Sequence, residues 1–482
     1  MFAFAYRLSA CCRASWIGFL VLPIVAGCGG GGSASGTGTA TVLKSVVIHP
    51  DAPVTGVGLT RQLSATGTYS DGKTADVTGQ ATWSSTVPAI ASIAGSSGLV
   101  TGVSLGTTII TVNVGSVSNS VPLKVISGVW TPAANAMVGH AYHTATLLRD
   151  GRILLVGGQT AAVEIYDPVA DSWTSAASLT GPLSGHTATL LADGTVLVTG
   201  GFDPSTPVFY NQVEIYDPVT NNWTQGPQMQ VPHAYHTATV LNNGKVLVVG
   251  GTGGNSFNAP TDVVEIYDPV GKSWSSAAVL PQSRTMHTAT LLPSGKVLVA
   301  GGATSIDPVA VWASNAVIYD PASNQWSSTG ALVMPRIRHS AMLLPSGQVL
   351  LAGGQDVTGH ILTSVESYDP LTNAWSAMPN LGLGRELATG IAMPGGKILL
   401  VGGLSECAPS CPPGTLAIPT ATSELLDPVT DTWTQTARLN QARSAHTGTL
   451  TAQGVVVVVG GYGPIAGNPF AVDLTASAEL YW

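Results

Sequence analysis

Six histidines recur at nearly equal spacing, each followed by Thr or Ser: His143, His186, His236, His287, His339 and His446. Six imidazoles raise the hypothesis of a metal site, because neutral imidazole is a common ligand of zinc. Residues that occur once in each repeated unit lie, however, too far apart for several of them to reach one ion at about 2 Å. The regular recurrence favours a hydrogen bond repeated between neighbouring units, and we expect neither a metal site nor a cofactor.

A second recurring position, which we call the slot, lies three residues before each of these histidines and before Ala388, which replaces the histidine in the sixth unit. In chain order it holds His140, Leu183, His233, Arg284, Arg336, Arg385 and Arg443. Guanidinium groups bind carboxylates and sulfates through paired hydrogen bonds, so the slot predicts that its four arginines, with His140 and His233, contact a ligand. The alternative is structural, with each cation pairing an acidic residue of its own unit: Glu164, Glu214, Glu265, Glu366, Glu424 or Glu479. The sequence leaves both alternatives open.

The elements that must position these residues are repeated strands. Each unit contains an HTATLL-type run, an apolar run closed by Gly-Gly, a VEIYDP-type run and a segment around a Trp. Asp-Gly and Asn-Gly dipeptides between the first two runs favour two-residue hairpin turns. The Gly pairs begin at Gly157, Gly200, Gly250, Gly301, Gly353, Gly402 and Gly460. Seven copies about fifty residues apart resemble kelch repeats, which implies an all-β, seven-bladed propeller.

The ends of the repeat region predict how the ring closes. The last repeat stops at AELYW and lacks a fourth strand, whereas GVWTPAANAM, with Trp130, stands before the first repeat without a unit of its own. Pairing the two ends removes two exposed sheet edges. We therefore expect the strand around Trp130 to lie beside the strand that ends at Trp482, in a propeller over residues 127–482.

Long, dissimilar loops follow the Gly pairs, and loops of varied sequence on a fixed scaffold are where specificity is expected. These loops share one face of the propeller with the segments that precede each His. Their aromatic residues include Trp312 and Tyr210, which we predict to contact a ligand by stacking on sugar rings, with plain loop packing as the alternative. Their carboxylates are Asp203, Asp262, Asp307, Asp356, Glu406 and Asp473. A convergent pair of them would allow acid–base chemistry, but no spacing singles out a pair.

The kelch resemblance covers about three quarters of the chain and does not choose a function. Kelch propellers include protein-binding adaptors, a copper sugar oxidase family and sialic-acid mutarotases. The oxidase chemistry needs a Cys cross-linked to a Tyr among tyrosine and histidine ligands, and no such set is visible here. We predict a non-catalytic envelope protein whose loop face binds carbohydrate or protein. The alternative is a sugar-active enzyme, a mutarotase or hydrolase, that uses loop carboxylates.

Residues 42–126 alternate short β-rich runs with Gly, Pro and Asp, as in RQLSATGTYSDGKTADVTGQATWSS. Leu63, Ala65 and Tyr69 recur at strand spacing, and Trp83 is the expected central aromatic residue. This stretch resembles the group 2 bacterial Ig-like domain. The resemblance implies a β-sandwich that serves as a spacer or adhesion module, with independent ligand binding as the alternative.

The N-terminus predicts export. Arg7 and Arg13 precede an apolar run and Val-Ala-Gly-Cys, so residues 1–27 read as a signal peptide. The last four residues resemble a bacterial lipobox, which implies a lipid on Cys28 and an outer-membrane location on the periplasmic side or the cell surface. The alternatives are a plain signal peptide or a single membrane span. Residues 28–41 read as a flexible Gly/Ser tether. In such an oxidising compartment Cys407 and Cys411 are expected to form a disulfide within one loop, with a redox site as the minor alternative.

The charge balance excludes one class of partner. The chain has 18 basic and 26 acidic residues, a net charge of −8, and removal of Arg7 and Arg13 with the signal leaves 16 basic residues and a net charge of −10. No tract rich in Lys and Arg is present. We therefore expect no nucleic-acid partner, and we expect the membrane to be met through the lipid anchor alone.

Overall fold

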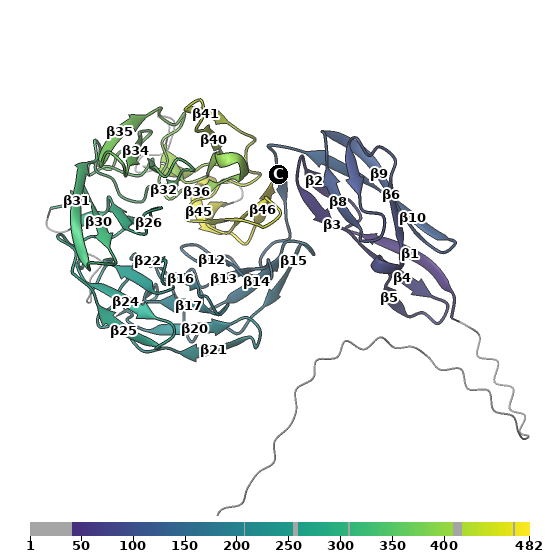
Figure 1. Cartoon of the computed structure of the whole chain (residues 1–482), viewed down its shortest axis with the longest axis horizontal. Helices are drawn as coiled ribbons and strands as arrows, with labels where there is room; N and C mark the ends of the chain where they lie inside the picture. The colour runs from purple at the N-terminus through teal and green to yellow at the C-terminus, as the bar shows by residue number, and fades with distance from the viewer. Residues whose placement is uncertain (1–40, 207, 254–258, 307–308, 408–416, 466–467) are drawn as a thin grey trace, which may run out of the picture. The chain divides into compact units, whose positions relative to one another are not determined.

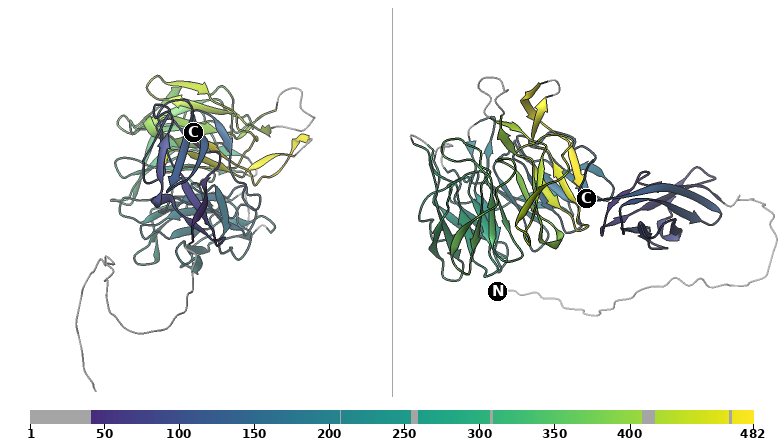
Figure 2. Two further views of the ribbon diagram at one scale, coloured as in Figure 1. Left: turned by 90° about the vertical axis from the view of Figure 1, so that its right-hand side faces the viewer. Right: turned by 90° about the horizontal axis from the view of Figure 1, so that it is seen from above.

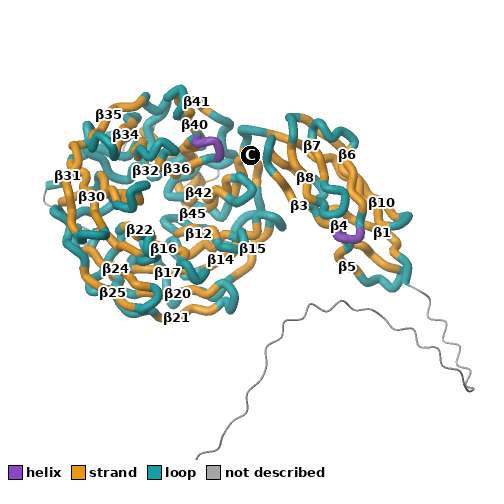
Figure 3. The backbone as a smooth tube through the Cα atoms, in the orientation of Figure 1, coloured by secondary structure: helices purple, strands orange, loops and turns teal. Residues whose placement is uncertain are grey.

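The computed structural model describes residues 41–206, 208–253, 259–306, 309–407, 417–465 and 468–482, and residues 43–482 form one compact unit. Nearly all of its regular structure is β-strand (Figures 1 and 3). Two short 3-10 turns are the exceptions, η1 at Thr78–Gln80 and η2 at Pro394–Gly396. Among the described residues, no helix is long and apolar enough to cross a membrane. The predicted signal peptide, tether and Cys28 lie outside the described residues.

The N-terminal part of this unit is a small β-sandwich. Its sheets have the strand orders β1-β4-β5, β2-β10-β9-β6 and β3-β8-β7, with β2 parallel to β10. The strands are β1 (Leu43–His49), β2 (Val54–Gly56), β3 (Thr60–Gln62), β4 (Ser64–Tyr69), β5 (Thr74–Asp76), β6 (Thr82–Ser85), β7 (Ala91–Ile93), β8 (Leu99–Gly102), β9 (Gly106–Val114) and β10 (Val117–Ile126). Leu63, Ala65 and Trp83 are buried in its core, as their spacing predicts, whereas Tyr69 is half-buried.

Most of the remaining strands form seven four-stranded antiparallel sheets, or blades, arranged radially about a common centre (Figure 1). The innermost strands are β12 (Thr144–Leu147), β16 (Thr187–Leu190), β22 (Thr237–Val240), β26 (Thr288–Leu291), β32 (Ser340–Leu343), β36 (Thr389–Ala392) and β42 (Thr447–Leu450). Each contacts the innermost strands of the two neighbouring blades, and β12 contacts β42, so the ring is closed. We number the blades 1 to 7 by these strands.

Second strands carry the apolar runs, and third strands carry the VEIYDP-type runs. The second strands are β13 (Ile153–Val156), β17 (Val196–Thr199), β23 (Val246–Val249), β27 (Val297–Ala300), β33 (Val349–Ala352), β37 (Ile398–Val401) and β43 (Val456–Val459). The third strands are β14 (Val163–Asp167), β20 (Val213–Asp217), β24 (Val264–Asp268), β30 (Asn315–Asp320), β34 (Val365–Asp369), β40 (Ser423–Asp427) and β46 (Ala478–Tyr481). Every second strand is buried along its whole length, because blades cover both of its faces.

The outermost strands of blades 1 to 6 carry the tryptophans. They are β15 (Ser172–Ser175), β21 (Asn222–Gln225), β25 (Ser273–Ser276), β31 (Gln325–Ala331), β35 (Ala374–Met378) and β41 (Thr432–Gln435). Blade 7 takes its outermost strand, β11 (Trp130–Pro132), from the start of the repeat region, and Trp130 lies opposite Tyr481. The predicted pairing of the two ends is therefore confirmed.

The Gly pairs let neighbouring blades approach closely. Both members adopt positive φ, as at Gly353 (66°) and Gly354 (95°). A Cβ on Gly353 would lie 2.2 Å from the main-chain oxygen of Arg385 in the next blade. Only glycine fits such a place without moving the backbone.

The turns between first and second strands differ from the prediction. The Leu148 amide donates to the Arg152 carbonyl, and Gly151 adopts a φ of 88°. Three residues therefore lie between the last hydrogen-bonded pair, Leu148 and Arg152, instead of the predicted two. A three-residue hairpin loop places its glycine in the left-handed region, which is why the Asp-Gly signal marks this turn as well.

Four of the long loops after the Gly pairs fold into hairpins of their own. The pairs are β18 (Phe202–Asp203) with β19 (Val208–Phe209), β28 (Ala303–Ser305) with β29 (Val311–Trp312), β38 (Leu404–Glu406) with β39 (Ala417–Pro419), and β44 (Tyr462–Ile465) with β45 (Asn468–Leu474). The last hairpin, drawn in yellow, stands out from one face of the propeller (Figure 2). Cys407 is disulfide-bonded, and Cys411, its predicted partner, lies outside the described residues.

Candidate ligand-binding site

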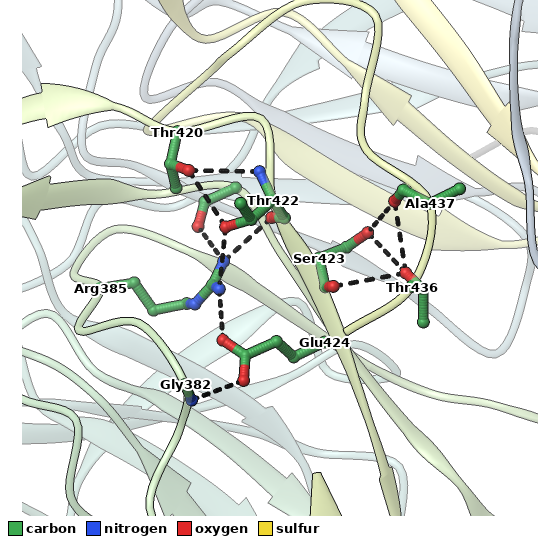
Figure 4. A network of polar contacts seen from close by, with 9 residues as sticks. Gly382, Arg385, Thr420, Thr422, Ser423, Glu424, Thr436 and Ala437 are labelled. Atoms are coloured by element: carbon green, nitrogen blue, oxygen red, sulfur yellow. Dashed lines mark hydrogen bonds and ion pairs between the residues drawn. The ribbon is translucent and has the colours of Figure 1, made fainter. Parts of the chain in front are cut away.

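The slot three residues before each His is buried inside the blades. In blade 6 the Arg385 guanidinium donates to the main-chain oxygens of Gly402 (2.8 Å) and Thr422 (3.0 Å) and to the Glu424 carboxylate (2.6 Å) (Figure 4). Arg336 in blade 5 and Arg443 in blade 7 repeat this pattern with Glu366 and Glu479. The Arg385 side chain has no exposed surface.

Histidine fills the same slot in blades 1 and 3. His140 lies 2.6 Å from the Gly157 oxygen through Nδ1 and 3.0 Å from the Glu164 carboxylate through Nε2. His233 makes the same two contacts with Gly250 and Glu265. The carboxylates also accept backbone amides of the incoming loop, such as Met137 on Glu164. Where the slot holds Arg or His, it thus fastens the loop before a blade to that blade's third strand.

This placement corrects the ligand-binding prediction for Arg284, Arg336, Arg385, Arg443, His140 and His233. All six side chains are surrounded by protein acceptors and at most 1% exposed, so they cannot meet a ligand from solvent. The structural alternative, pairing with the third-strand Glu, is the one observed in five blades. Burying a charge this deeply is tolerated because both terminal guanidinium nitrogens of each arginine have close acceptors, although the buried Nε of Arg284, Arg385 and Arg443 has none within the described residues.

The histidine ring joins neighbouring blades. Nε2 of His186 lies 3.0 Å from the Thr144 hydroxyl of blade 1, and His143 lies 2.8 Å from Thr447 of blade 7. Burial lowers the pKa of His186 to about 4 and that of His287 to about 3, so these rings are neutral at pH 7. This bears out the expected hydrogen bond between units. Among the described residues no three His, Cys, Asp or Glu side chains are grouped as metal ligands.

The residue just before each His forms a different ring, which we call the mouth ring. Its members are Tyr142, Gly185, Tyr235, Met286, Arg338, Leu387 and Ala445, and all have positive φ. Each is half-buried, between the buried His and the centre of the propeller. Successive members are linked by main-chain hydrogen bonds, such as Leu387 N–H to Arg338 O at 3.0 Å and Ala445 N–H to Leu387 O at 3.1 Å.

The mouth ring encloses a pocket of about 290 Å³ at the centre of the propeller. Its wall consists of ring members together with the histidines beneath them. The main-chain hydrogen bonds between ring members, which we call the backbone belt, hold the loops in place. The side chains of the ring vary from aromatic to aliphatic to cationic. A rigid frame with varied side chains is the usual construction of a binding site.

Tyr142 and Tyr235 line this pocket, and further aromatic side chains pack against them. Tyr142 meets Tyr235 edge to face, with ring centres 6.2 Å apart, and Tyr462 of β44 packs against Tyr142 at 6.1 Å. Phe202 of β18 lies 5.6 Å from Tyr235. Gly185 makes these contacts possible, since a Cβ there would lie 3.2 Å from the Phe202 ring.

An ion pair lies on the mouth ring between blades 5 and 6. Arg338 reaches Glu386 at 3.4 Å, and the Arg338 side chain is 33% exposed. Burial raises the pKa of Glu386, while Arg338 acts against that shift. Because a third of its side chain is exposed, the Arg338 guanidinium is accessible to a ligand, in contrast to the buried arginines two positions earlier in blades 4 to 7.

The two aromatic candidates from the loops lie away from the mouth pocket. Trp312 is half-buried on β29, where its main chain pairs with Ala303. Tyr210 lines a second pocket, in blade 2, together with Asp203. Of the loop carboxylates, Asp307 lies outside the described residues. Asp203 and Asp356 accept hydrogen bonds from their own turns, as Asp203 does from Ser205.

Sequence reasoning missed the mouth ring. The sequence did contain a signal for this ring. The residue just before the His changes in chemical type from one repeat to the next, while the residues on either side of it keep the same role. The prediction placed the informative variation two residues too early, because four arginines in one slot attracted more attention than a mixed set of side chains.

The geometry defines a β-propeller of repeated antiparallel blades closed by its first and last strands. Family models agree with this description: the attractin/LZTR1 β-propeller matches residues 160–358 and the kelch motif matches 338–382. The group 2 bacterial Ig-like domain matches residues 42–125. The chain therefore carries a group 2 bacterial Ig-like domain followed by a kelch-type propeller.

Curated relatives share only segments. Ice-binding protein 1 of Shewanella frigidimarina is 40% identical over 92 residues, 19% of this chain and 10% of that protein. Alpha-scruin of Limulus polyphemus is 32% identical over 128 residues, 24% of this chain and 13% of that protein. The chain thus spans about a tenth of the length of such relatives.

A solved structure shares the fold over a longer stretch. A fungal alcohol oxidase of the AA5 family, in complex with copper, superposes with a TM-score of 0.58 at 19% identity. The match covers 74% of this chain and 76% of that one. At this identity the likeness shows the fold alone, and a propeller of this kind supports binding or catalysis.

Proposed function

We propose that the propeller binds carbohydrate at the mouth pocket. The observation that carries the proposal is the combination of Tyr142 and Tyr235, backed by Tyr462, with the partly exposed Arg338 on the same ring. The buried Glu386 next to the ring pairs with Arg338. Sugar rings offer apolar C–H faces to aromatic side chains and hydroxyl groups to charged ones. A pocket of about 290 Å³ has room for about one or two sugar residues.

The positive charge of Arg338 on the mouth ring predicts a preference among sugars. The Arg338 guanidinium presents donors that pair bidentately with a carboxylate or sulfate. An acidic sugar could replace Glu386 as the partner of Arg338, or bridge both groups through hydroxyls. We therefore expect acidic or sulfated sugars to bind more tightly than their neutral counterparts.

A glycan array with residues 41–482 tests the proposal. We expect binding that weakens at least tenfold when Tyr142→Ala and Tyr235→Ala are combined, because two stacking surfaces are lost. Tyr210→Ala is the matched control, since Tyr210 lines a different pocket and the variant should bind normally. An array on which the wild-type protein captures no glycan would overturn the proposal.

The cellular setting is also a proposal. The signal-like N-terminus and the Cys28 motif support an envelope protein anchored by lipid, with the Ig-like domain and the tether holding the propeller away from the membrane. Cys28→Ala should move the protein from the membrane fraction to the soluble fraction. A protein that stays in the membrane fraction after this substitution would contradict the anchor.

A further inference from the structure

Blade 2 keeps the acidic member of the buried pair but has lost the basic one. Leu183 occupies the slot that holds Arg or His in every other blade, whereas Glu214 remains at its place on β20. In the part of the chain that the structure describes, Glu214 has no basic partner and accepts a hydrogen bond from Thr180. Burial raises the pKa of Glu214, as expected of a carboxylate without a cation.

A pocket of about 290 Å³ lies where the missing side chain would be. It is lined by Leu183 and Glu214 and by Gly200 and Gln212. In blade 6 the corresponding residues, Gly402 and Thr422, offer their main-chain oxygens to one arm of Arg385, and Glu424 accepts the other. Blade 2 therefore keeps the oxygen acceptors that hold a guanidinium group in blade 6, which we call the cradle. In blade 2 these acceptors surround an open space.

Blade 4 shows the opposite loss. Arg284 remains, but Val317 stands where the other blades have Glu, opposite Val299 on β27. The guanidinium still lies fully buried on the oxygens of Gly301 (3.1 Å) and Asn315 (3.2 Å). Blade 4 thus holds a guanidinium without a carboxylate, through this carbonyl pair and the side-chain oxygen of Asn315 at 3.4 Å. In blade 2 the carbonyl pair is combined with a carboxylate.

The rim of the blade 2 pocket adds negative charge. Asp203 lines it, and hydrogen bonds from Ser205 and Thr206 lower the pKa of this carboxyl group, so it is ionised at neutral pH. Tyr210 contributes an aromatic face and a hydroxyl group beside it. A cation with several N–H donors and a flat shape fits this set of acceptors better than a compact ammonium ion.

We propose that the blade 2 pocket is a binding site for a guanidinium group, supplied either by a small free guanidine compound or by an arginine side chain of a peptide or protein. The ligand takes the place that Arg336, Arg385 and Arg443 occupy in their own blades, with Glu214 as its counter-ion. The site is separate from the mouth pocket, because the two share no lining residue.

Calorimetric titration of the full mature chain tests the proposal. The probes are methylguanidinium chloride, acetyl-Gly-Gly-Arg-amide and methylammonium chloride, each at constant ionic strength. We expect methylguanidinium to bind with a dissociation constant on the order of 1 mM, as for other ligands of very few atoms. Methylammonium should bind at least about tenfold more weakly, since it lacks the paired donors. Tighter binding of the peptide than of methylguanidinium would identify an arginine side chain as the source, and the reverse order a small free guanidine.

Two variants make the test specific. Glu214→Gln keeps the shape and removes the charge, so methylguanidinium affinity should fall at least about tenfold. Leu183→Arg should abolish binding and raise the melting temperature, because the new side chain occupies the cradle as in blades 5 to 7. Equal binding of methylguanidinium by the wild type and Leu183→Arg, or no binding by the wild type, would overturn the proposal. Tyr142→Ala should leave this binding unchanged.

Discussion

Arg336 and Arg338 stand two residues apart in one loop, yet they meet different surroundings. Arg336 has no exposed side-chain surface and lies 2.6 Å from Glu366 in the same blade. Arg338 is one-third exposed and lies 3.4 Å from Glu386 of the loop that enters the next blade. The first arginine belongs to the scaffold, and the second belongs to the mouth ring.

The difference between them shows how this repeat separates structure from recognition. Between the two arginines the chain passes from the interior of a blade to the centre of the propeller. Positions that face the interior keep one chemical role in most repeats, because each blade has the same strand to hold. Positions that face the pocket change from Tyr to Met to Arg, because no repeated contact constrains them.

Arg336→Ala should have the largest effect on stability. The change removes a buried cation and leaves Glu366 without its partner, which costs about 3–5 kcal/mol in comparable cases. Urea denaturation would measure the loss of free energy of unfolding. Arg338→Ala is the matched control. A similar loss of stability in both variants would contradict the distinction between the slot and the mouth ring.

The histidine ring predicts that stability falls in mild acid. The folded-state pKa of His186, about 4, lies below its ordinary value of 6.5, so the unfolded state binds more protons between these values. The stabilisation is complete above pH 6.5 and is lost as the pH falls, by up to about 1.4 kcal/mol per pH unit for each such histidine. Denaturation midpoints measured from pH 7.5 to 5 would show this slope.

A matched variant makes the pH test specific. His186→Ala copies the natural state of blade 6, where Ala388 takes the place of the histidine. Its stability should depend less steeply on pH than that of the wild type over the same range. Identical slopes in the two proteins would mean that His186 binds protons equally in the folded and unfolded states, which would contradict its lowered pKa.

Arg338→Ala should affect binding more than folding. Its ion pair is partly solvated, so the cost in stability should be no more than about 1 kcal/mol. If acidic sugars bind at the mouth pocket, their affinity should fall about tenfold while neutral sugars lose little. Paired titrations with an acidic sugar and its neutral counterpart measure this difference, and Arg149→Ala, on the opposite end of blade 1, serves as a surface control.

Gly185→Ala should lower stability by about 1 kcal/mol, well below the cost of Arg336→Ala. The backbone there has a φ of 64°, which disfavours a side chain, and the new methyl group would press on Phe202. Thermal unfolding would detect this cost. Because Tyr235 would move with Phe202, glycan binding should weaken as well, and a variant that binds with unchanged affinity would place the ligand away from Tyr142 and Tyr235.

Much of the fold could be predicted because repetition makes each signal visible several times. The Gly pairs, the VEIYDP-type runs and the unmatched strand at Trp130 together indicated the blades and their closure. The same repetition led to a wrong prediction of the ligand-binding residues. Sequence spacing does not tell whether a side chain four residues before a strand points into a blade or toward the centre. The pattern was conspicuous at Arg284, Arg336, Arg385 and Arg443.

The sequence by itself determined the class of scaffold, since strand period, turn residues and apolar runs are local properties that each repeat specifies again. Only the tertiary structure decided which side chains meet. The backbone belt that sets Tyr142 beside Tyr235, and the open space that Leu183 leaves beside Glu214, arise from contacts between segments distant in the chain. Such contacts depend on how the blades close around the centre, and a linear pattern does not contain that geometry.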